Sequence, residues 1–357
     1  MTTAHQTRLA EGAQVPLLEV RHVVKEFALE RKKGTVTQHD VVHAVTDVSL
    51  RVAPGEILAL VGESGSGKTT LANCIARFED PTEGEILLNG QPLVTADRRG
   101  ARSRVRWRRS RRSMAGLIQM VFQDPSSALN PRHRVGRALV GPLMLHGARR
   151  ADAEKRSIEL LELTGLSAAT MSAYPHQLNA GQRQRVVIAR ALTLSPRLLL
   201  ADEAVSRLDV SMQSRVLNLL LRVRDELGVT IIFITHDLSV VRQVADRVAV
   251  MYLGRIMEVC DADDFFGQPS HPYSEALMRS TPTFNLAADH YEILEGEIPS
   301  PVHPPTGCPF VTRCPKAEAQ CNESPPALRE VRPRDFAACV LFPERQSKVS
   351  TPASQPH

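Results

Sequence analysis

The segment from Gly62 to Thr69 constrains the fold of this chain more than any other stretch. It reads Gly-Glu-Ser-Gly-Ser-Gly-Lys-Thr and matches the pattern G-x-x-x-x-G-K-[ST] without a mismatch. It follows the apolar run 57–61, which is typical of a buried parallel strand, and helical spacing begins at Lys68. A glycine-rich turn between a strand and a helix directs backbone N–H groups and a helix N-terminus at phosphate oxygens. The sequence therefore predicts an α/β fold with a phosphate-binding loop.

Individual positions of this loop can be assigned from the same chemistry. Lys68 is expected to reach the β- and γ-phosphates of a nucleotide, and the Thr69 hydroxyl is expected to bind magnesium. The alternative is a glycine-rich turn that precedes Lys-Thr by chance, and the flanking strand and helix argue against it. The residues expected to contact the nucleotide are Gly62, Glu63, Ser64, Gly65, Ser66, Gly67, Lys68, Thr69 and Thr70.

Two acids follow a second apolar run. Residues 198–201 read Leu-Leu-Leu-Ala, and Asp202 and Glu203 come directly after them. The carboxyl ends of parallel strands form the edge where ligands bind, so these acids are expected near the loop. Asp202 would hold magnesium, directly or through water, and Glu203 would orient and deprotonate an attacking water. Two solvated acids at the end of a strand are the alternative.

Apolar patterns predict strands that alternate with helices, and therefore a largely parallel sheet. Near residue 268 the composition changes, and five prolines lie between Pro299 and Pro309, which favours extended chain. Gly228 is expected to end a helix that includes residues 216–227. Strands are predicted over 17–27, 41–52, 57–61, 117–122, 198–201 and 229–235.

The composition excludes several classes of protein. Hydrophobic residues make up 43% of the 357 residues, which suits a packed core. No apolar run approaches the ~20 residues of a membrane-spanning helix, and residues 1–15 lack the apolar core of a secretory signal. Aromatic residues make up only 4%, which argues against an aromatic nucleic-acid platform. We therefore expect a soluble, cytosolic protein.

Further motifs, in the expected order, resemble those of the ATPase subunits of ABC transporters, over about residues 17–345. Residues 174–185, which read YPHQLNAGQRQR, resemble the family signature and the basic helix after it. Gln123 matches the Q-loop, residues 206–209 match the D-loop, and His236 matches the switch histidine. Phe27 lies where the family places an aromatic ring that stacks on adenine.

The resemblance implies a P-loop NTPase of the ABC type. Its parts would be a RecA-like core with a mainly parallel sheet, an N-terminal antiparallel β subdomain, a helical subdomain carrying the signature, and a small Cys/Pro-rich C-terminal extension. The expected boundaries are a flexible N-terminus at 1–16, an ATPase domain at 17–268 with its helical subdomain at about 125–190, an extension at 269–345, and a disordered tail at 346–357.

The resemblance also implies a mechanism in which two ATPase domains pair head to tail around ATP and Mg2+. One domain would supply the loop with Asp202, Glu203, Gln123 and His236, and Gln123 would also bind magnesium. The other domain would supply its signature to the γ-phosphate. In this chain the signature residues expected to contact nucleotide are Asn179, Gly181 and Gln182.

The signature and the D-loop depart from the family pattern. Asn179 replaces a serine, Ala180 replaces a glycine, and Arg207 replaces a small residue. These residues serve the ATP bound by the partner, so one interpretation is a competent site on this chain beside a weakened opposite site. The other interpretation is a tolerated variation with two working sites.

Two regions resemble the oligopeptide/dipeptide importers and match their second ATPase subunit best. These regions are 123–131, and a C-terminal set with 271–273, 307–310 and 313–315. The resemblance implies ATP hydrolysis coupled to import of peptides or a related small solute, at the cytoplasmic face of the inner membrane. The implied partners are a second ATPase subunit, two permease subunits and an extracytoplasmic solute-binding protein. The alternatives are a soluble ABC-type ATPase not coupled to transport, and a partly degenerate or non-hydrolysing partner in an asymmetric heterodimer.

Two further features stay open at this level. Cys308, Cys314, Cys321 and Cys339 are either ligands of a [4Fe-4S] cluster, which some relatives carry in this segment, or reduced structural thiols. Residues 98–112 hold nine arginines, and without them acidic groups would outnumber basic ones. We expect a solvated basic loop there, with contact to anionic lipid or to a permease as the next alternative. Nucleic-acid binding is not expected.

Overall fold

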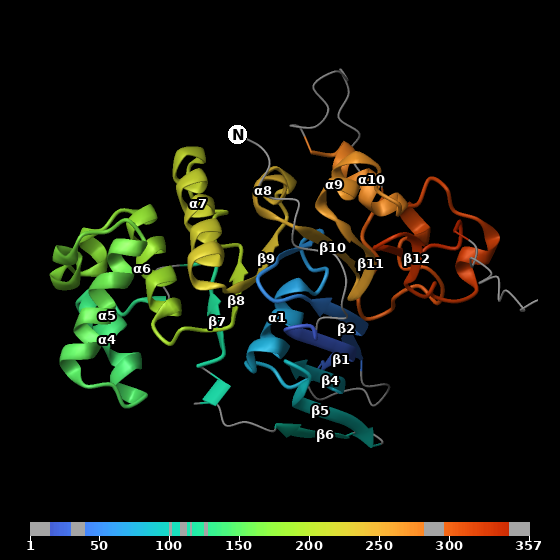
Figure 1. The fold of residues 1–357 in the computed structure, drawn as a ribbon. Helices are drawn as coiled ribbons and strands as arrows, with labels where there is room; N and C mark the ends of the chain where they lie inside the picture. Colours follow the sequence, from blue (N-terminus) through green and yellow to red (C-terminus); the bar gives the residue numbers. More distant parts are fainter. Residues whose placement is uncertain are drawn as a thin grey trace, which may run out of the picture.

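The structure is a computed structural model that describes residues 15–29, 40–99, 102–107, 113–114, 116–124, 128–281 and 296–342. It contains an antiparallel sheet, a larger mixed sheet and a lobe of helices (Figure 1). The expected N-terminal segment, the tail and much of the arginine run lie outside the described residues. None of the helices in these ranges combines the length and apolarity that a bilayer-crossing helix requires.

The larger sheet has the order β12-β13-β11-β10-β3-β9-β8-β7. The five strands from β10 to β7 are parallel, and β11, β13 and β12 extend the sheet antiparallel at the β10 side. The strands are β3 (Ile57–Val61), β7 (Ile118–Val121), β8 (Leu198–Asp202), β9 (Thr230–Thr235), β10 (Arg247–Tyr252), β11 (Arg255–Asp261), β12 (Arg329–Arg332) and β13 (Asp335–Ala337).

The antiparallel sheet has the order β2-β1-β4-β5-β6. One apolar core lies between this sheet, helix α1 and the larger sheet, and includes Leu18, Leu71 and Leu200. The strands are β1 (Leu18–Ala28), β2 (Val41–Val52), β4 (Glu83–Leu88), β5 (Gln91–Arg99) and β6 (Arg102–Trp107). The strands predicted over 17–27, 41–52, 57–61, 117–122, 198–201 and 229–235 are all confirmed.

Helices cover the larger sheet and give it two further apolar cores. One core joins β7, β8 and β9 to the helical lobe, and the other joins β3, β10 and β11 to the C-terminal region. Gly228 ends α7 with a φ of +65°, as expected from its lack of a Cβ. The helices are α1 (Lys68–Ala76), α4 (Val135–Leu145), α5 (Arg150–Leu163), α6 (Ala180–Leu192), α7 (Val210–Leu227), α8 (Leu238–Val244), α9 (Ala262–Gly267) and α10 (Pro272–Arg279), with short 3-10 turns at Ala168–Ser172, Pro175–Gln177, Val311–Arg313 and Ala319–Asn322.

The expectation of a solvated loop over the arginine run is wrong for its described part. The first half of the run forms the antiparallel pair β5 and β6, with six residues of each strand in register. Antiparallel pairing satisfies the backbone groups of this segment. Arg98 also forms ion pairs with Glu26 on β1 and Glu83 on β4. Strand pairing and acidic side chains on β4 and β1 of the same sheet therefore accommodate this basic segment as a strand pair.

Candidate nucleotide-binding site

The loop between β3 and α1 depends on three glycines with positive φ. Gly62, Gly65 and Gly67 have φ values of +148°, +78° and +100°. A Cβ on Gly62 would lie 2.1 Å from the carbonyl oxygen of Met251, and a Cβ on Gly67 would lie 2.2 Å from that of Ala44. A Cβ on Gly65 would meet nothing within 4 Å. The backbone of the loop is therefore held tightly against β2 and β10 at two of its three glycines.

We expect Gly67→Ala to impair ATP binding far more than Gly65→Ala. Both changes place a Cβ at positive φ, which costs about 1–2 kcal/mol, but only the Gly67 substitution also collides with a backbone carbonyl. Calorimetric titration with MgATP, together with thermal unfolding, measures the difference. Equal affinities for the two variants would show that the close approach of Gly67 to Ala44 is unimportant.

Lys68 is held by the loop itself. Its ammonium group donates hydrogen bonds to the carbonyl oxygens of Gly62 at 2.8 Å and Glu63 at 2.7 Å, and to the hydroxyl of Ser66 at 3.1 Å. The residue is only 7% exposed. Burial lowers the pKa of Lys68 to about 8, against the opposing effect of the acids Glu203 and Asp202. The side chain is thus positioned over the loop, where a triphosphate would lie.

The edge of the larger sheet places oxygen ligands beside this loop. The hydroxyl of Thr69, at the start of α1, donates to Oδ1 of Asp202 at 3.3 Å. Asp202 ends β8 and is 6% exposed, and burial raises its pKa. A hydroxyl and a carboxylate side by side are ligands that suit Mg2+. The geometry therefore fits the expected magnesium site at Thr69 and Asp202.

Glu203 brings the remaining expected catalytic residues together. Its Oε1 lies 3.0 Å from Nδ1 of His236, and its Oε2 accepts a hydrogen bond from Nε2 of Gln123. Gln123 follows β7 and His236 follows β9, so the ends of three neighbouring strands converge on one carboxylate. Glu203 also has a φ of +46°, a strained conformation for a residue with a side chain. Strain of this kind is concentrated at functional sites.

The signature residues lie apart from this cluster, at the start of α6 in the helical lobe (Figure 1). Asn179 caps the helix, because its Oδ1 accepts the N–H of Gln182 at 2.8 Å and Oε1 of Gln182 accepts the N–H of Asn179 at 3.0 Å. Asn179 and Ala180 are exposed, whereas Gly181 is buried against Met212. An exposed position suits residues that serve another chain.

Phe27 lies near the end of β1 and is half-buried. The ammonium group of Lys25 is 4.5 Å from the centre of its ring. A stacking role toward adenine remains a prediction.

Two features of the site were not anticipated from sequence. The N–H of Glu63 donates to the hydroxyl of Tyr273, and the carboxylate of Glu63 pairs with Arg313. Tyr273 and Arg313 both belong to the C-terminal motifs, but they are 210 and 250 residues away from Glu63. No local pattern predicts a contact over that separation.

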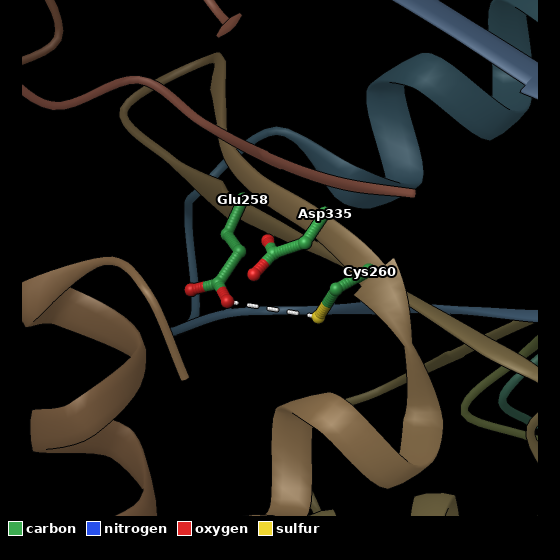
Figure 2. Close-up of side chains that lie close together, drawn as sticks. All are labelled: Glu258, Cys260 and Asp335. Carbon is green, nitrogen blue, oxygen red and sulfur yellow. Dashed lines mark hydrogen bonds between the residues drawn. The ribbon is translucent and has the colours of Figure 1, made fainter. Parts of the chain in front are cut away.

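The second unanticipated feature is a buried cluster of Glu258, Cys260 and Asp335 (Figure 2). One oxygen or sulfur atom of each lies within 4.8 Å of the others, and the thiol is 3.6 Å from Oε1 of Glu258. The Glu258 carboxylate already accepts the N–H groups of Ser270 and His271, both at 2.8 Å. We therefore assign the cluster to holding the turn that leads into α10.

Comparison with known proteins agrees with this arrangement. Residues 45–206 match the family described as ABC transporter, and residues 257–321 match the oligopeptide/dipeptide transporter C-terminal region. A protein of Brucella ovis described as a peptide import ATP-binding protein is 43% identical over 329 residues, covering 92% of this chain and 98% of the relative. The chain belongs to the ABC transporter ATPase family. Like other members, it is an ATP-hydrolysing cassette that takes ATP and Mg2+.

Other members of the family support the assignment. An oligopeptide transport ATP-binding protein of Bacillus subtilis is 42% identical, covering 92% of this chain and 98% of the relative. The structure of cbiO1 from Clostridium perfringens, part of an ABC transporter complex, matches with a TM-score of 0.59 and 27% identity, covering 71% of this chain and 92% of that one. A dimeric ATP-binding cassette in a post-hydrolysis state bound to ADP and Pi matches with a TM-score of 0.57 and 27% identity, covering 69% and 98%. The ABC-type fold expected from the motifs is confirmed.

Proposed function

We propose that this chain is the ATP-hydrolysing subunit of an importer for peptides or a related small solute. The observation that carries the proposal is the match of residues 257–321 to the C-terminal region of oligopeptide/dipeptide transporters. Relatives described as peptide or oligopeptide transport ATP-binding proteins, similar over nearly their whole length, support it. Peptide as the solute is thus supported by this match and by these relatives.

Within this proposal each residue of the site has a role. The loop with Lys68 binds the triphosphate, and Thr69 and Asp202, with Gln123, hold Mg2+. Glu203 orients the attacking water and accepts its proton, since its carboxylate is the shared partner of Gln123 and His236. His236 contacts the same carboxylate from the neighbouring strand and keeps it oriented. Phe27 stacks on adenine.

The proposal includes an assembly at the cytoplasmic face of a membrane. ABC transporter ATPases act as dimers beside permease subunits. We add a second ATPase chain, two permeases and an extracytoplasmic solute-binding protein as the specific partners. Affinity purification of the tagged chain from solubilised membranes is expected to bring two integral membrane proteins with it. Recovery as a solitary chain outside the membrane fraction would favour the soluble-ATPase alternative.

We propose that the Asn179 signature weakens the ATP site that this chain completes for its partner. The helix cap uses Oδ1 of Asn179, so only the amide NH2 is left to meet a γ-phosphate, on a longer stem than a serine hydroxyl. Asn179→Ser keeps a good N-cap and is expected to raise turnover of the complex. Asn179→Ala is expected to lower the stability of this chain by about 1 kcal/mol. Phosphate release and chemical denaturation measure the two effects, and unchanged turnover of Asn179→Ser would support two working sites.

We propose that the C-terminal region holds a [4Fe-4S] cluster. The observation behind this proposal is that Cys308, Cys314, Cys321 and Cys339, four thiols of the kind that ligate such clusters, line one small cavity. When bound, a cluster would cross-link the four segments of the C-terminal region that carry these cysteines. Anaerobic purification is expected to give brown, iron-containing protein, whereas colourless, iron-free protein would leave the four residues as reduced thiols.

A further inference from the structure

Two side chains of the C-terminal region, Arg313 and Tyr273, contact Glu63 in the phosphate loop. The guanidinium group of Arg313 donates to both carboxylate oxygens of Glu63, at 2.6 Å and 3.0 Å. The side chain of Arg313 is 4% exposed and that of Glu63 is 24% exposed. A two-pronged, largely buried pair of this kind fixes orientation as well as distance, unlike a surface ion pair.

A second contact fixes the main chain at the same position. The N–H of Glu63 donates to the hydroxyl of Tyr273 at 3.0 Å. Arg313 also donates to the hydroxyl of Tyr252 at 3.3 Å. The rings of Tyr252, Tyr273 and Phe310 pack together with centroids 4.7–5.5 Å apart. Glu63 is therefore held at both its backbone and its side chain by groups outside the loop.

The groups that hold Glu63 are themselves anchored in the large sheet. The N–H of Tyr273 donates to Nδ1 of the buried His271 at 3.0 Å, and Glu258 of β11 accepts the N–H of His271. On the neighbouring β13, Asp335 accepts a hydrogen bond from the hydroxyl of Ser270 at 2.6 Å. Buried hydrogen bonds among Asp335, Ser270, Glu258, His271 and Tyr273, together with the half-buried bond from Tyr273 to Glu63, thus link the C-terminal strands to the phosphate loop.

The position of Glu63 makes this contact relevant to the nucleotide. Its carbonyl oxygen is one of the two that hold the ammonium group of Lys68. Its carboxylate is a negative charge within the loop, and the loop is the expected binding site of a negatively charged triphosphate. A positive charge beside the carboxylate would offset the repulsion between these two groups. Arg313 supplies a positive charge that contacts both oxygens of this carboxylate.

We propose that Arg313 is a positioning residue for ATP, which acts through Glu63 to hold the phosphate loop and to neutralise its carboxylate. The C-terminal region is then part of the nucleotide site of this chain rather than a separate appendage. The inference rests on the proposed function only in requiring that the loop bind ATP.

The test compares full-length variants in the assembled complex. Arg313→Gln is expected to raise KM for ATP about tenfold with kcat changed less than about twofold, because the contact supports ground-state and transition-state binding equally. Such a change corresponds to ~1.4 kcal/mol. The double variant Glu63→Gln/Arg313→Gln is expected to recover most of the affinity, since the repelling carboxylate is gone. Arg313→Lys is expected to give an intermediate KM, because lysine keeps the positive charge but cannot donate two parallel hydrogen bonds to the carboxylate.

A matched control comes from the same region. Lys316 pairs with Glu275 at 2.8 Å rather than with a residue of the loop, and Lys316→Gln is expected to leave KM unchanged. A lower melting temperature for Arg313→Gln with an unchanged KM would assign the pair a structural role and overturn the inference. If Arg313→Gln does not fold, the inference is tested with Arg313→Lys instead. A wild-type KM for Arg313→Lys would refute a positioning role for the two hydrogen bonds of the guanidinium group. Absence of MgATP binding to the wild-type chain would instead refute the proposed function, and the inference with it.

Discussion

Glu203→Gln is expected to lower ATP turnover of the assembled complex by a factor of about 10²–10⁴, the usual contribution of a general base. The amide cannot accept a proton from water, although it preserves the size of the side chain. ATP should still bind, because Lys68 and the loop are unchanged. Phosphate release under single-turnover conditions, with a parallel nucleotide titration, measures the two properties separately.

The exposed Glu162, on α5, provides a matched control, and Glu162→Gln is expected to retain wild-type turnover. Turnover within a few-fold of wild type for Glu203→Gln would show that the base is another group. The same substitution at the equivalent position of the partner ATPase tests asymmetry. Because the Glu203 site is the competent one in our proposal, the loss should be larger here than in the partner, and equal losses would argue against asymmetry.

Lys68→Ala is expected to weaken binding of MgATP by about one to two orders of magnitude. Hydrogen bonds to charged groups contribute about 1.5–3 kcal/mol, which corresponds to that range. The truncation also removes the hydrogen bonds that the carbonyls of Gly62 and Glu63 accept from Lys68, so the conformation of the loop is less well stabilised. Calorimetric titration measures the affinity, and thermal unfolding shows how much of the loss reflects folding.

Lys68→Arg is the matched variant, because it retains the charge. The site leaves Lys68 only 7% exposed, so the larger guanidinium should not fit and affinity should still fall. Wild-type affinity in both variants would place the triphosphate elsewhere on the molecule.

The residues around Glu203 show how far sequence reasoning reaches into the site. Asp202 and Glu203 could be placed at a sheet edge because they end an apolar run, and the structure puts them there, with Asp202 beside Thr69. Gln123 and His236 came from family resemblance alone, since a single polar residue after a strand has no pattern of its own. The positive φ of Glu203 could not be predicted, because a glutamate side chain does not favour a left-handed backbone conformation.

The arginine run shows where sequence reasoning failed. Its charge suggested a solvated loop, yet β5 and β6 pair through residues 94–99 and 102–107. Charge density is a local property, whereas a strand is stabilised by its neighbours across the sheet. Arg98 contacts Glu26, more than seventy positions away along the chain, and no window of sequence contains both.

The amino-acid sequence by itself determined the phosphate loop, the alternation of strands and helices, and the order of the ATPase motifs. Each of these depends on residues that are close together in the chain, such as the run from Gly62 to Thr69. Only the tertiary structure decided that Arg313 and Tyr273 hold Glu63, and that β13 and β12 continue the ATPase sheet. Those contacts form because folding buries polar groups that must then find partners, and the partners available are chosen by proximity in space rather than along the chain.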